Sequence, residues 1–218
     1  MKERPILFSG AMVRAILDGR KTVTRRIVRF PRKEPHTFWG AAYPHPSGIG
    51  WLFADHPLDA GLIAAVSKGR TGTLCPYGAP GDRLWVRETW ATLTNNGIRT
   101  VYRADGEDPR TGWDDVPPER RPRMTWRPSI FMRREESRLT LDVVSVRVER
   151  LQDITEEDAR AEGFSSEPMP ARINGEPGQV WVFDPVTWFA KTWDTINADR
   201  ATWLSNPWVW RVEFRRRP

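Results

Sequence analysis

Two residue types that often carry function are scarce in this chain. Cys75 is the only cysteine among 218 residues, which excludes an internal disulfide framework and a multi-cysteine zinc site. The three histidines, His36, His45 and His56, share one Pro/Gly-rich segment and lack ligand spacing. Histidine-based triads and histidine metal sites are therefore disfavoured, and we expect neither a bound metal nor a cofactor.

Long apolar runs are also missing. No stretch approaches the ~20 apolar residues that span a membrane, and the N-terminus has no signal-peptide pattern. The mean hydropathy of -0.58 describes a somewhat polar chain. The sequence therefore predicts a soluble protein of the cytoplasm that has no membrane partner.

Positive charge and tryptophan are present in excess. The formal net charge is +6 and the pI is near 10.0, which favours a polyanionic or phosphate-bearing partner. Six of the 12 tryptophans fall between Trp181 and Trp210. Because large aromatic side chains are usually buried, this clustering predicts a tryptophan-rich core near the C-terminus. Exposed tryptophans would instead stack on nucleic-acid bases.

Periodicity and helix punctuation predict an α+β fold. At 218 residues the chain is long enough for one domain with a proper core. The expected elements are strand 4–8, helix 10–18, strand 81–90, strand 139–151, helix 155–163, a helix from 184 and strand 208–215. This order is most economically a small β-barrel with helices packed over it.

The densest concentration of chemistry is G-R-K-T-V-T-R-R, from Gly19 to Arg26. Lys21 and Thr24 can act as base and nucleophile if burial and the neighbouring arginines lower the lysine pKa. In a regular strand these two residues would face opposite sides, so the chemistry requires a turn at Gly19–Thr22. Taken alone, the spacing is a weak pattern, and a solvated basic loop is the simpler interpretation.

Two glutamates are candidate partners for this segment. Glu162 falls in the last turn of its helix, where the negative end of the helix dipole disfavours a carboxylate. That setting suits a general acid or base, and an ordinary surface glutamate is the alternative. Glu88 follows an inward-pointing strand. It either lines the same pocket, holds Arg26, or forms a structural pair with another arginine.

Arginines are interleaved with aromatic residues around Trp126 and Phe131. This arrangement fits contact with a nucleic-acid backbone together with base stacking. A solvated loop with a hydrophobic anchor is the alternative interpretation. The arginines of this segment are Arg120, Arg121, Arg123, Arg127, Arg133 and Arg134.

Four segments, in order, resemble the ASCH family of the PUA-like superfamily. They are I-L-D-G-R-K-T-V-T-R-R, which is similar to the family's G-x-K-x-x-x-x-R signature, G-D-R-L-W-V at 81–86, L-Q-D-I-T-E-E-D-A-R-A-E-G at 151–163, and the closing N-P-W-V-W-R-V-E-F. W-R-P-S-I at 126–130 resembles phage and prophage members. The resemblance implies one PUA-like β-barrel domain, residues 1–218, with packed helices and with insertions at about 27–80 and 91–137.

Within that family, the chain most resembles the N4-acetylcytidine amidohydrolases. The resemblance implies a metal-independent hydrolase whose catalytic group is Lys21, Thr24 and Glu162. Thr24 would attack the acyl carbonyl with help from Lys21. In a variant mechanism, Glu162 activates water and Lys21 stabilises the oxyanion. The expected substrate-binding residues are Arg26, Glu88 and Trp126.

Two other functions are compatible with the same resemblance. The ASCH family includes RNA-binding and ribonuclease members, so the fold alone does not fix the activity. A non-enzymatic module for RNA or modified nucleic acid is favoured by the basic charge and the aromatic residues. A ribonuclease is disfavoured because no histidine lies near the motifs. Arg25 departs from the amidohydrolase pattern, since those enzymes can carry an apolar residue there.

Overall fold

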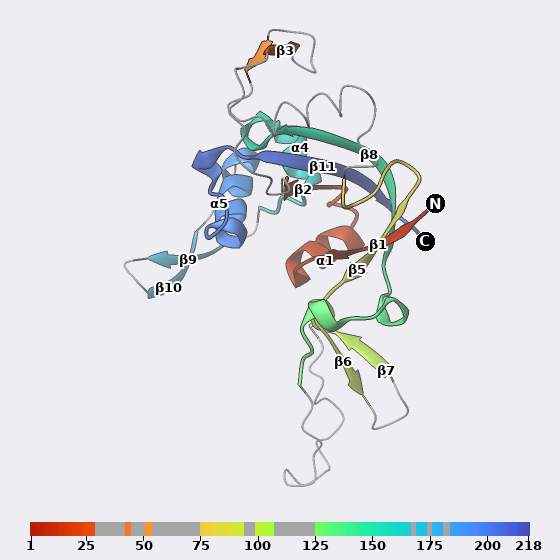
Figure 1. Cartoon of the computed structure of the whole chain (residues 1–218). Helices are drawn as coiled ribbons and strands as arrows, with labels where there is room; N and C mark the ends of the chain where they lie inside the picture. The colour runs from red at the N-terminus through yellow and green to blue at the C-terminus, as the bar shows by residue number, and fades with distance from the viewer. Residues whose placement is uncertain are drawn as a thin grey trace.

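The computed structural model has an α+β fold, as the sequence predicts. It describes residues 1–28, 42–44, 51–53, 75–93, 99–106, 125–166, 169–173, 176–180 and 184–218. Helices pack around a mixed five-stranded sheet (Figure 1). Residues of interest that lie outside the described ranges are His36, His45, His56, Arg120, Arg121, Arg123 and Trp181.

The sheet is built from strands that are far apart in the sequence. In order across the sheet, they are β1 (Glu3–Leu7), β5 (Arg83–Arg87), β8 (Thr140–Arg150), β11 (Trp208–Arg216) and β2 (Val23–Ile27). β1 runs parallel to β5, and the other neighbours are antiparallel. The paired strands β8 and β11 form a long arch over the molecule (Figure 1).

The predicted closed barrel is not seen, because the sheet is open between its edge strands β1 and β2. Closure requires a backbone ladder that joins the two edges, and none is present among the described strands. A side chain connects the edges instead: Nη2 of Arg26 donates to the carbonyl oxygen of Leu7 over 2.5 Å. The α+β class is therefore confirmed, and the barrel expectation is corrected to an open sheet.

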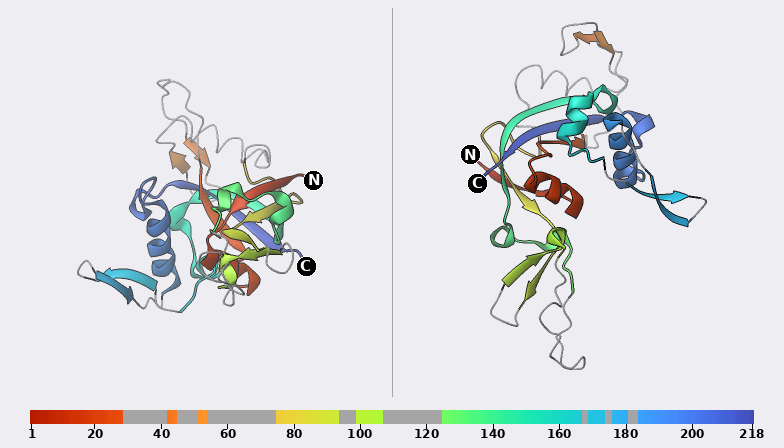
Figure 2. Two further views of the ribbon diagram at one scale, coloured as in Figure 1. Left: turned by 90° about the horizontal axis from the view of Figure 1, so that it is seen from below. Right: turned by 180° about the vertical axis from the view of Figure 1, so that it is seen from behind.

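Antiparallel hairpins lie outside this sheet. β6 (Trp90–Leu93) pairs with β7 (Arg99–Tyr102), β3 (Ala42–Pro44) with β4 (Trp51–Phe53), and β9 (Met169–Ile173) with β10 (Glu176–Val180). The right view in Figure 2 shows β6–β7 and β9–β10 projecting from the rest of the molecule. Apart from Ile27, no residue of the five-stranded sheet falls within the predicted insertions 27–80 and 91–137.

Each α-helix in the described ranges begins after a capping residue. The caps are Ser9 for α1 (Gly10–Leu17), Thr155 for α4 (Glu156–Ala161) and Asp184 for α5 (Pro185–Asn197), and each side chain accepts a backbone N–H. The described 3₁₀ helices are η1 (Arg103–Asp105), η3 (Ser129–Phe131), η4 (Arg134–Glu136), η5 (Leu151–Asp153) and η6 (Trp203–Ser205). In the described ranges, no helix is long and apolar enough to cross a membrane.

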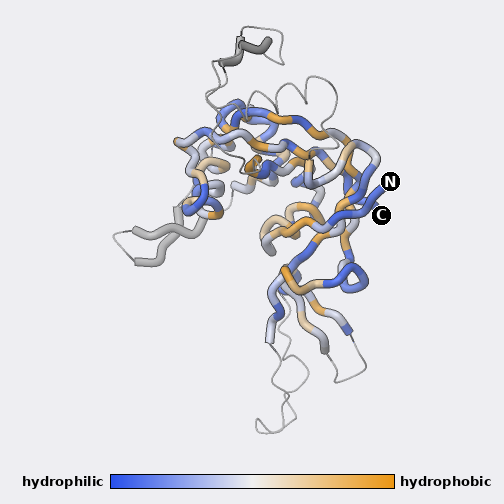
Figure 3. Tube along the Cα trace, in the orientation of Figure 1, coloured by the Kyte–Doolittle hydropathy of each residue, from blue (hydrophilic) through white to orange (hydrophobic). Residues whose placement is uncertain are grey.

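Apolar side chains pack against both faces of the central strands. Hydrophobic and hydrophilic residues alternate along β8 (Figure 3). On one face, Val212 of β11 belongs to a cluster with Val13 and Ile16 of α1. On the other face, Val209 of β11 belongs to a cluster with Phe189 of α5. The predicted tryptophan-rich core is confirmed by the buried residues Trp193, Trp208 and Trp210.

Gly163 follows α4 at a point where a Cβ would be crowded by its neighbours. Its φ is +99°, and a Cβ built there would lie 3.0 Å from Ala15 Cβ and 3.2 Å from Lys21 Cβ. We expect Gly163→Ala to cost more than the ~1–2 kcal/mol of left-handed strain alone. Gly81→Ala is the matched control, because its φ is +89° and its Cβ would meet nothing within 4 Å. Urea unfolding measures both costs, and equal costs would contradict the crowding.

Candidate active site

The segment after α1 turns sharply and comes to lie against the end of α4. Gly19 has a φ of +75°, a conformation that glycine adopts without steric cost. The backbone N–H of Lys21 then donates to Ala15 O over 2.9 Å, and that of Thr22 donates to Ala161 O over 2.8 Å. The turn that the sequence requires at Gly19–Thr22 is therefore present, and it brings Lys21 beside the C-terminal end of α4.

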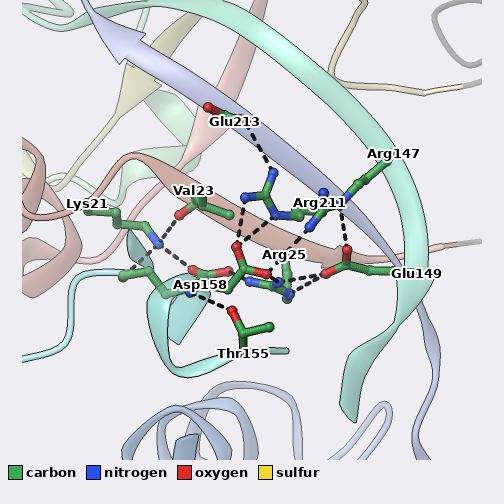
Figure 4. A network of polar contacts seen from close by, with 10 residues as sticks. Lys21, Val23, Arg25, Arg147, Glu149, Thr155, Asp158, Arg211 and Glu213 are labelled. Atoms are coloured by element: carbon green, nitrogen blue, oxygen red, sulfur yellow. Dashed lines mark hydrogen bonds and ion pairs between the residues drawn. The ribbon is translucent and has the colours of Figure 1, made fainter. Parts of the chain in front are cut away.

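The amine of Lys21 is buried and fully engaged. Its side chain is 0% exposed, which rules out the solvated basic loop. Nζ lies 2.7 Å from Val23 O (Figure 4), 2.9 Å from Glu162 O and 2.6 Å from Glu162 Oε2. Glu162 is the C-cap residue of α4 and is buried, so it is not an ordinary surface glutamate. The structure thus joins two of the three predicted catalytic residues.

The environment of Lys21 lowers the pKa of its amine. Burial lowers the pKa of Lys21, the charge and hydrogen bond of Glu162 oppose that change, and the charges of Arg26 and Arg25 add to it. Two of the three Nζ contacts are to carbonyl oxygens, which can only accept. The contact with Glu162 Oε2 is therefore the one at which a proton can pass between the amine and the carboxyl group.

Thr24 lies next to this pair but is not hydrogen-bonded to it. Thr24 is 2% exposed and pairs with Val212 in the ladder between β2 and β11. Because Lys21 Nζ contacts Val23 O, the amine lies beside the peptide group that joins Val23 to Thr24. In the described part of the chain, no hydrogen bond links the Thr24 hydroxyl to Lys21 or Glu162. If the Lys21–Glu162 pair acts as the base for Thr24, a hydrogen bond between the Thr24 hydroxyl and the pair must form when substrate binds.

The charged groups of Arg26 and Lys21 both lie near the ring of Phe8. Arg26 Cζ lies 5.1 Å from the ring centroid and Lys21 Nζ lies 5.7 Å from it. Residues two apart in a strand share a face, so Arg26 and Thr24 lie on the same side of β2. Nε of Arg26 is buried and has no hydrogen-bond partner in the structure described. This N–H is therefore a buried donor without an acceptor in the described part of the chain.

Three arginines form a row across β2, β11 and β8. Arg25 lies opposite Arg211, and Arg211 lies opposite Arg147. Like charges directly opposite each other destabilise a sheet, so the row requires counter-charges. Asp158 of α4 accepts from Arg25 and from Arg211, each over 2.7 Å. Glu149 of β8 accepts from Arg25 and Arg147, each over 2.8 Å (Figure 4).

Sequence reasoning missed this network. Thr155 Oγ1 accepts from Asp158 N over 3.1 Å, but the Asp158 carboxylate turns toward the arginines and does not complete a capping box. The available signal was a pair of charged residues at i, i+2 in each of two strands, which places both on one face. Those pairs are Arg147 with Glu149 and Arg211 with Glu213.

We expect Asp158→Asn to destabilise the fold by about 3–5 kcal/mol, because it leaves buried arginines without their shared counter-charge. Burial opposes ionisation of Asp158, but Arg211 and Arg25 outweigh it and lower its pKa. A lowered carboxyl pKa contributes stability above the unfolded value of about 3.9 that is lost as pH falls through the folded pKa. The difference in unfolding free energy between the natural chain and the variant should therefore shrink below about pH 4.

Urea unfolding at neutral and acid pH measures that difference. Glu156→Gln is the matched control, because Glu156 lies on the same helix and its side chain is 66% exposed. Its effect should stay within about 0.5 kcal/mol. An Asp158→Asn cost as small as that of the control would contradict the proposed role of Asp158.

Glu88 belongs to a different cluster from Lys21. It is buried and accepts from Arg138 over 2.9 and 3.1 Å. Arg138 also donates to Asp105 and lies 4.0 Å from the ring centroid of Tyr102. Burial raises the pKa of Glu88, and Arg138 opposes that rise. The prediction that Glu88 holds Arg26 is not met, and its described contacts are those of a structural Glu–Arg pair.

Trp126 and the described arginines around it contact side chains of the protein itself. Trp126 packs against Ala91 and Val101 of the β6–β7 hairpin, and Arg127 lies 4.9 Å from the ring centroid of Trp90. Arg134 pairs with Glu3 over 2.8 Å, and Arg133 contacts Glu135 over 3.7 Å. Two of the six predicted nucleic-acid contacts therefore already have acidic partners.

Cys75 offers no alternative nucleophile. It is buried, and burial raises the pKa of its thiol to about 11. The thiolate is the reactive form of cysteine, so this side chain is unreactive at neutral pH.

A scan against protein-family models and searches of the curated proteins and of the solved structures found no match. What the chain does is therefore inferred from the geometry of its residues and from the resemblance of its motifs.

Proposed function

We propose that the chain is an ASCH-type amidohydrolase of the cytoplasm that removes the acyl group from N4-acylated cytosine nucleosides. The observation that carries this proposal is the buried contact of 2.6 Å between Lys21 Nζ and Glu162 Oε2. It joins two motifs that are 141 residues apart in the sequence. Thr24 and the unpartnered Nε of Arg26 lie on the neighbouring strand.

A buried lysine with a lowered pKa supports a catalytic role more strongly than a structural one. Buried ion pairs often contribute no more stability than apolar residues of similar volume. Titratable groups with perturbed pKa values cluster at functional sites, and burial lowers the pKa of Lys21. A pair that shares one proton can take a proton from a nucleophile and deliver it to a leaving group.

The reaction then proceeds in two steps. Thr24 Oγ1 attacks the acyl carbon, and the Lys21–Glu162 pair takes the hydroxyl proton and gives a proton to the N4 nitrogen as the C–N bond breaks. Cytidine leaves, and the acyl group remains on Thr24 as an ester. Water then attacks the ester with the pair as base, the C–O bond to Thr24 breaks, and the proton returns to the threonine oxygen.

Of the three expected substrate-binding residues, Arg26 is the one that belongs to the proposed site. Its free Nε is a charged donor suited to a carbonyl oxygen of the substrate. Glu88 and Trp126 are not retained, because their described contacts are with Arg138 and with the β6–β7 hairpin.

Incubation with N4-acetylcytidine and with longer N4-acyl analogues tests the proposed function. Chromatography should show cytidine and one equivalent of carboxylic acid, and the dependence of the rate on chain length gives the acyl preference. If folded protein releases no cytidine from any member of the series, the proposed function is wrong.

Binding of RNA without hydrolysis is the second candidate function. The observation that favours it is the exposure of Phe131, which is 66% exposed and lies between Arg127 and Arg133 in the sequence. Such a module would bind oligonucleotides with an affinity that falls linearly with salt on a log–log plot. Weak binding to oligonucleotides, together with turnover of a free nucleoside, excludes this candidate.

A further inference from the structure

Arg25 holds the Glu162 carboxylate on the oxygen that Lys21 does not contact. The side chain of Arg25 is 0% exposed, and its Nη1 lies 3.3 Å from Glu162 Oε1. Lys21 Nζ lies 2.6 Å from Oε2. Each carboxylate oxygen of Glu162 therefore has its own cationic partner, and rotation of the carboxylate would break both contacts.

The guanidinium of Arg25 is fixed by groups other than Glu162. Its Nε lies 2.8 Å from Glu149 Oε1, and its Nη2 lies 2.7 Å from Asp158 Oδ2. Its Cζ also lies 5.8 Å from the centroid of the Phe189 ring. A planar guanidinium presents its donors in fixed directions. The contacts that Nε and Nη2 make with Glu149 and Asp158 therefore orient Nη1 toward Glu162.

We propose that Arg25 is a positioning residue that occupies Oε1 of Glu162 and thereby keeps Oε2 on the amine of Lys21. This inference rests on the proposed function of the Lys21–Glu162 pair. A lysine at position 25 would keep the positive charge but lose the planar fork that reaches three carboxylates. Loss of the fork frees the carboxylate to rotate away from Lys21.

Arg25 also acts on the protonation of Lys21. The titratable or charged groups that face the Lys21 amine are Glu162, Arg26 and Arg25. Burial lowers the pKa of Lys21 most, Glu162 opposes this, and the two arginine charges lower the pKa further. Removal of the charge in Arg25→Met takes away one of these effects and leaves Lys21 as the remaining described partner of the carboxylate, so the pKa of Lys21 should rise.

The test compares Arg25→Lys and Arg25→Met with Arg211→Lys. Arg211 is buried in the same row and contacts Asp158, but it does not contact Glu162. We expect both Arg25 variants to lower kcat for N4-acetylcytidine by roughly 100-fold with little change in KM, because the misplaced group acts on the chemical step. Arg211→Lys should lose stability but keep kcat and its pH profile.

Titration of the Lys21 amine by NMR supplies a readout that does not need turnover. The signal is assigned by its loss in Lys21→Met. The pKa of Lys21 should be higher in Arg25→Met than in the natural chain and unchanged in Arg211→Lys. Failure of the natural chain to hydrolyse any substrate would end the proposed function, yet this titration would still decide whether Arg25 acts on the pair.

Equal losses of kcat in Arg25→Lys and Arg211→Lys, with an unchanged Lys21 pKa in Arg25→Met, would overturn the inference and make Arg25 a purely structural residue. If Arg25→Met does not fold, Arg25→Lys alone decides between a positioning role and a purely structural role for Arg25. In that variant, kcat should fall while the retained charge keeps the Lys21 pKa close to that of the natural chain.

Discussion

Thr24→Val is expected to lower kcat for N4-acetylcytidine by more than about 1,000-fold, because it removes the nucleophile and keeps the shape of the side chain. Thr24 is buried in β2, so a substitution of equal size leaves the packing of the strand in place. Steady-state kinetics with cytidine as the measured product test this expectation, and unfolding by urea confirms that the variant is folded.

Thr24→Ser is the matched control, because serine keeps the hydroxyl and loses only a methyl group. It should retain most of the rate, although a small cavity in the strand lowers stability. If Thr24→Val keeps the full rate, Thr24 is not the nucleophile. The mechanism would then be the one in which Glu162 activates water and Lys21 stabilises the oxyanion.

Glu162→Gln should lower kcat by about 100- to 10,000-fold, the usual contribution of a general acid or base. Glutamine keeps the length of the side chain and an oxygen for Lys21, but it cannot take up a proton. The contact of 2.6 Å between Lys21 Nζ and Oε2 would therefore survive as a hydrogen bond without proton transfer. Steady-state kinetics with N4-acetylcytidine for both proteins measure the loss of the general acid or base.

Glu213→Gln is the control for Glu162→Gln. Glu213 lies on β11 in the same network and contacts Arg211 and Ser145, but it contacts neither Lys21 nor Arg25. It should keep kcat and the pH profile of the natural chain. Similar losses in both variants would show that the network matters only for folding, which would contradict the assignment of Glu162.

Local signals predicted most of the elements in the described part of the chain. Ser9, Thr155 and Asp184 cap the helices that the sequence places after them, because a capping side chain needs only its own backbone neighbours. The closed barrel was wrong because closure depends on pairing between β1 and β2, which are edge strands of the sheet. Periodicity within a strand carries no information about which strand lies beside it.

The candidate site was predicted only in part, because motifs identify residues but not the partners that packing brings to them. Motif resemblance identified Lys21 and Glu162, and the structure joins them. The partners of Arg25 were not predicted, and a structural Glu–Arg pair was only one alternative for Glu88, because such partners are chosen by non-local packing. Arg25 meets Asp158 only because α4 packs over the row of arginines across β2, β11 and β8.

A single-turnover reaction with N4-acetylcytidine, quenched in acid and followed by digestion and mass spectrometry, tests the central claim most directly. The claim is that Thr24 and the Lys21–Glu162 pair form an acyl-transfer site. We predict an acetyl group on the peptide that carries Thr24, released on the timescale of cytidine turnover and absent in Thr24→Val. Cytidine release without any acetyl group on that peptide, at a rate that Thr24→Val retains in full, would contradict the account.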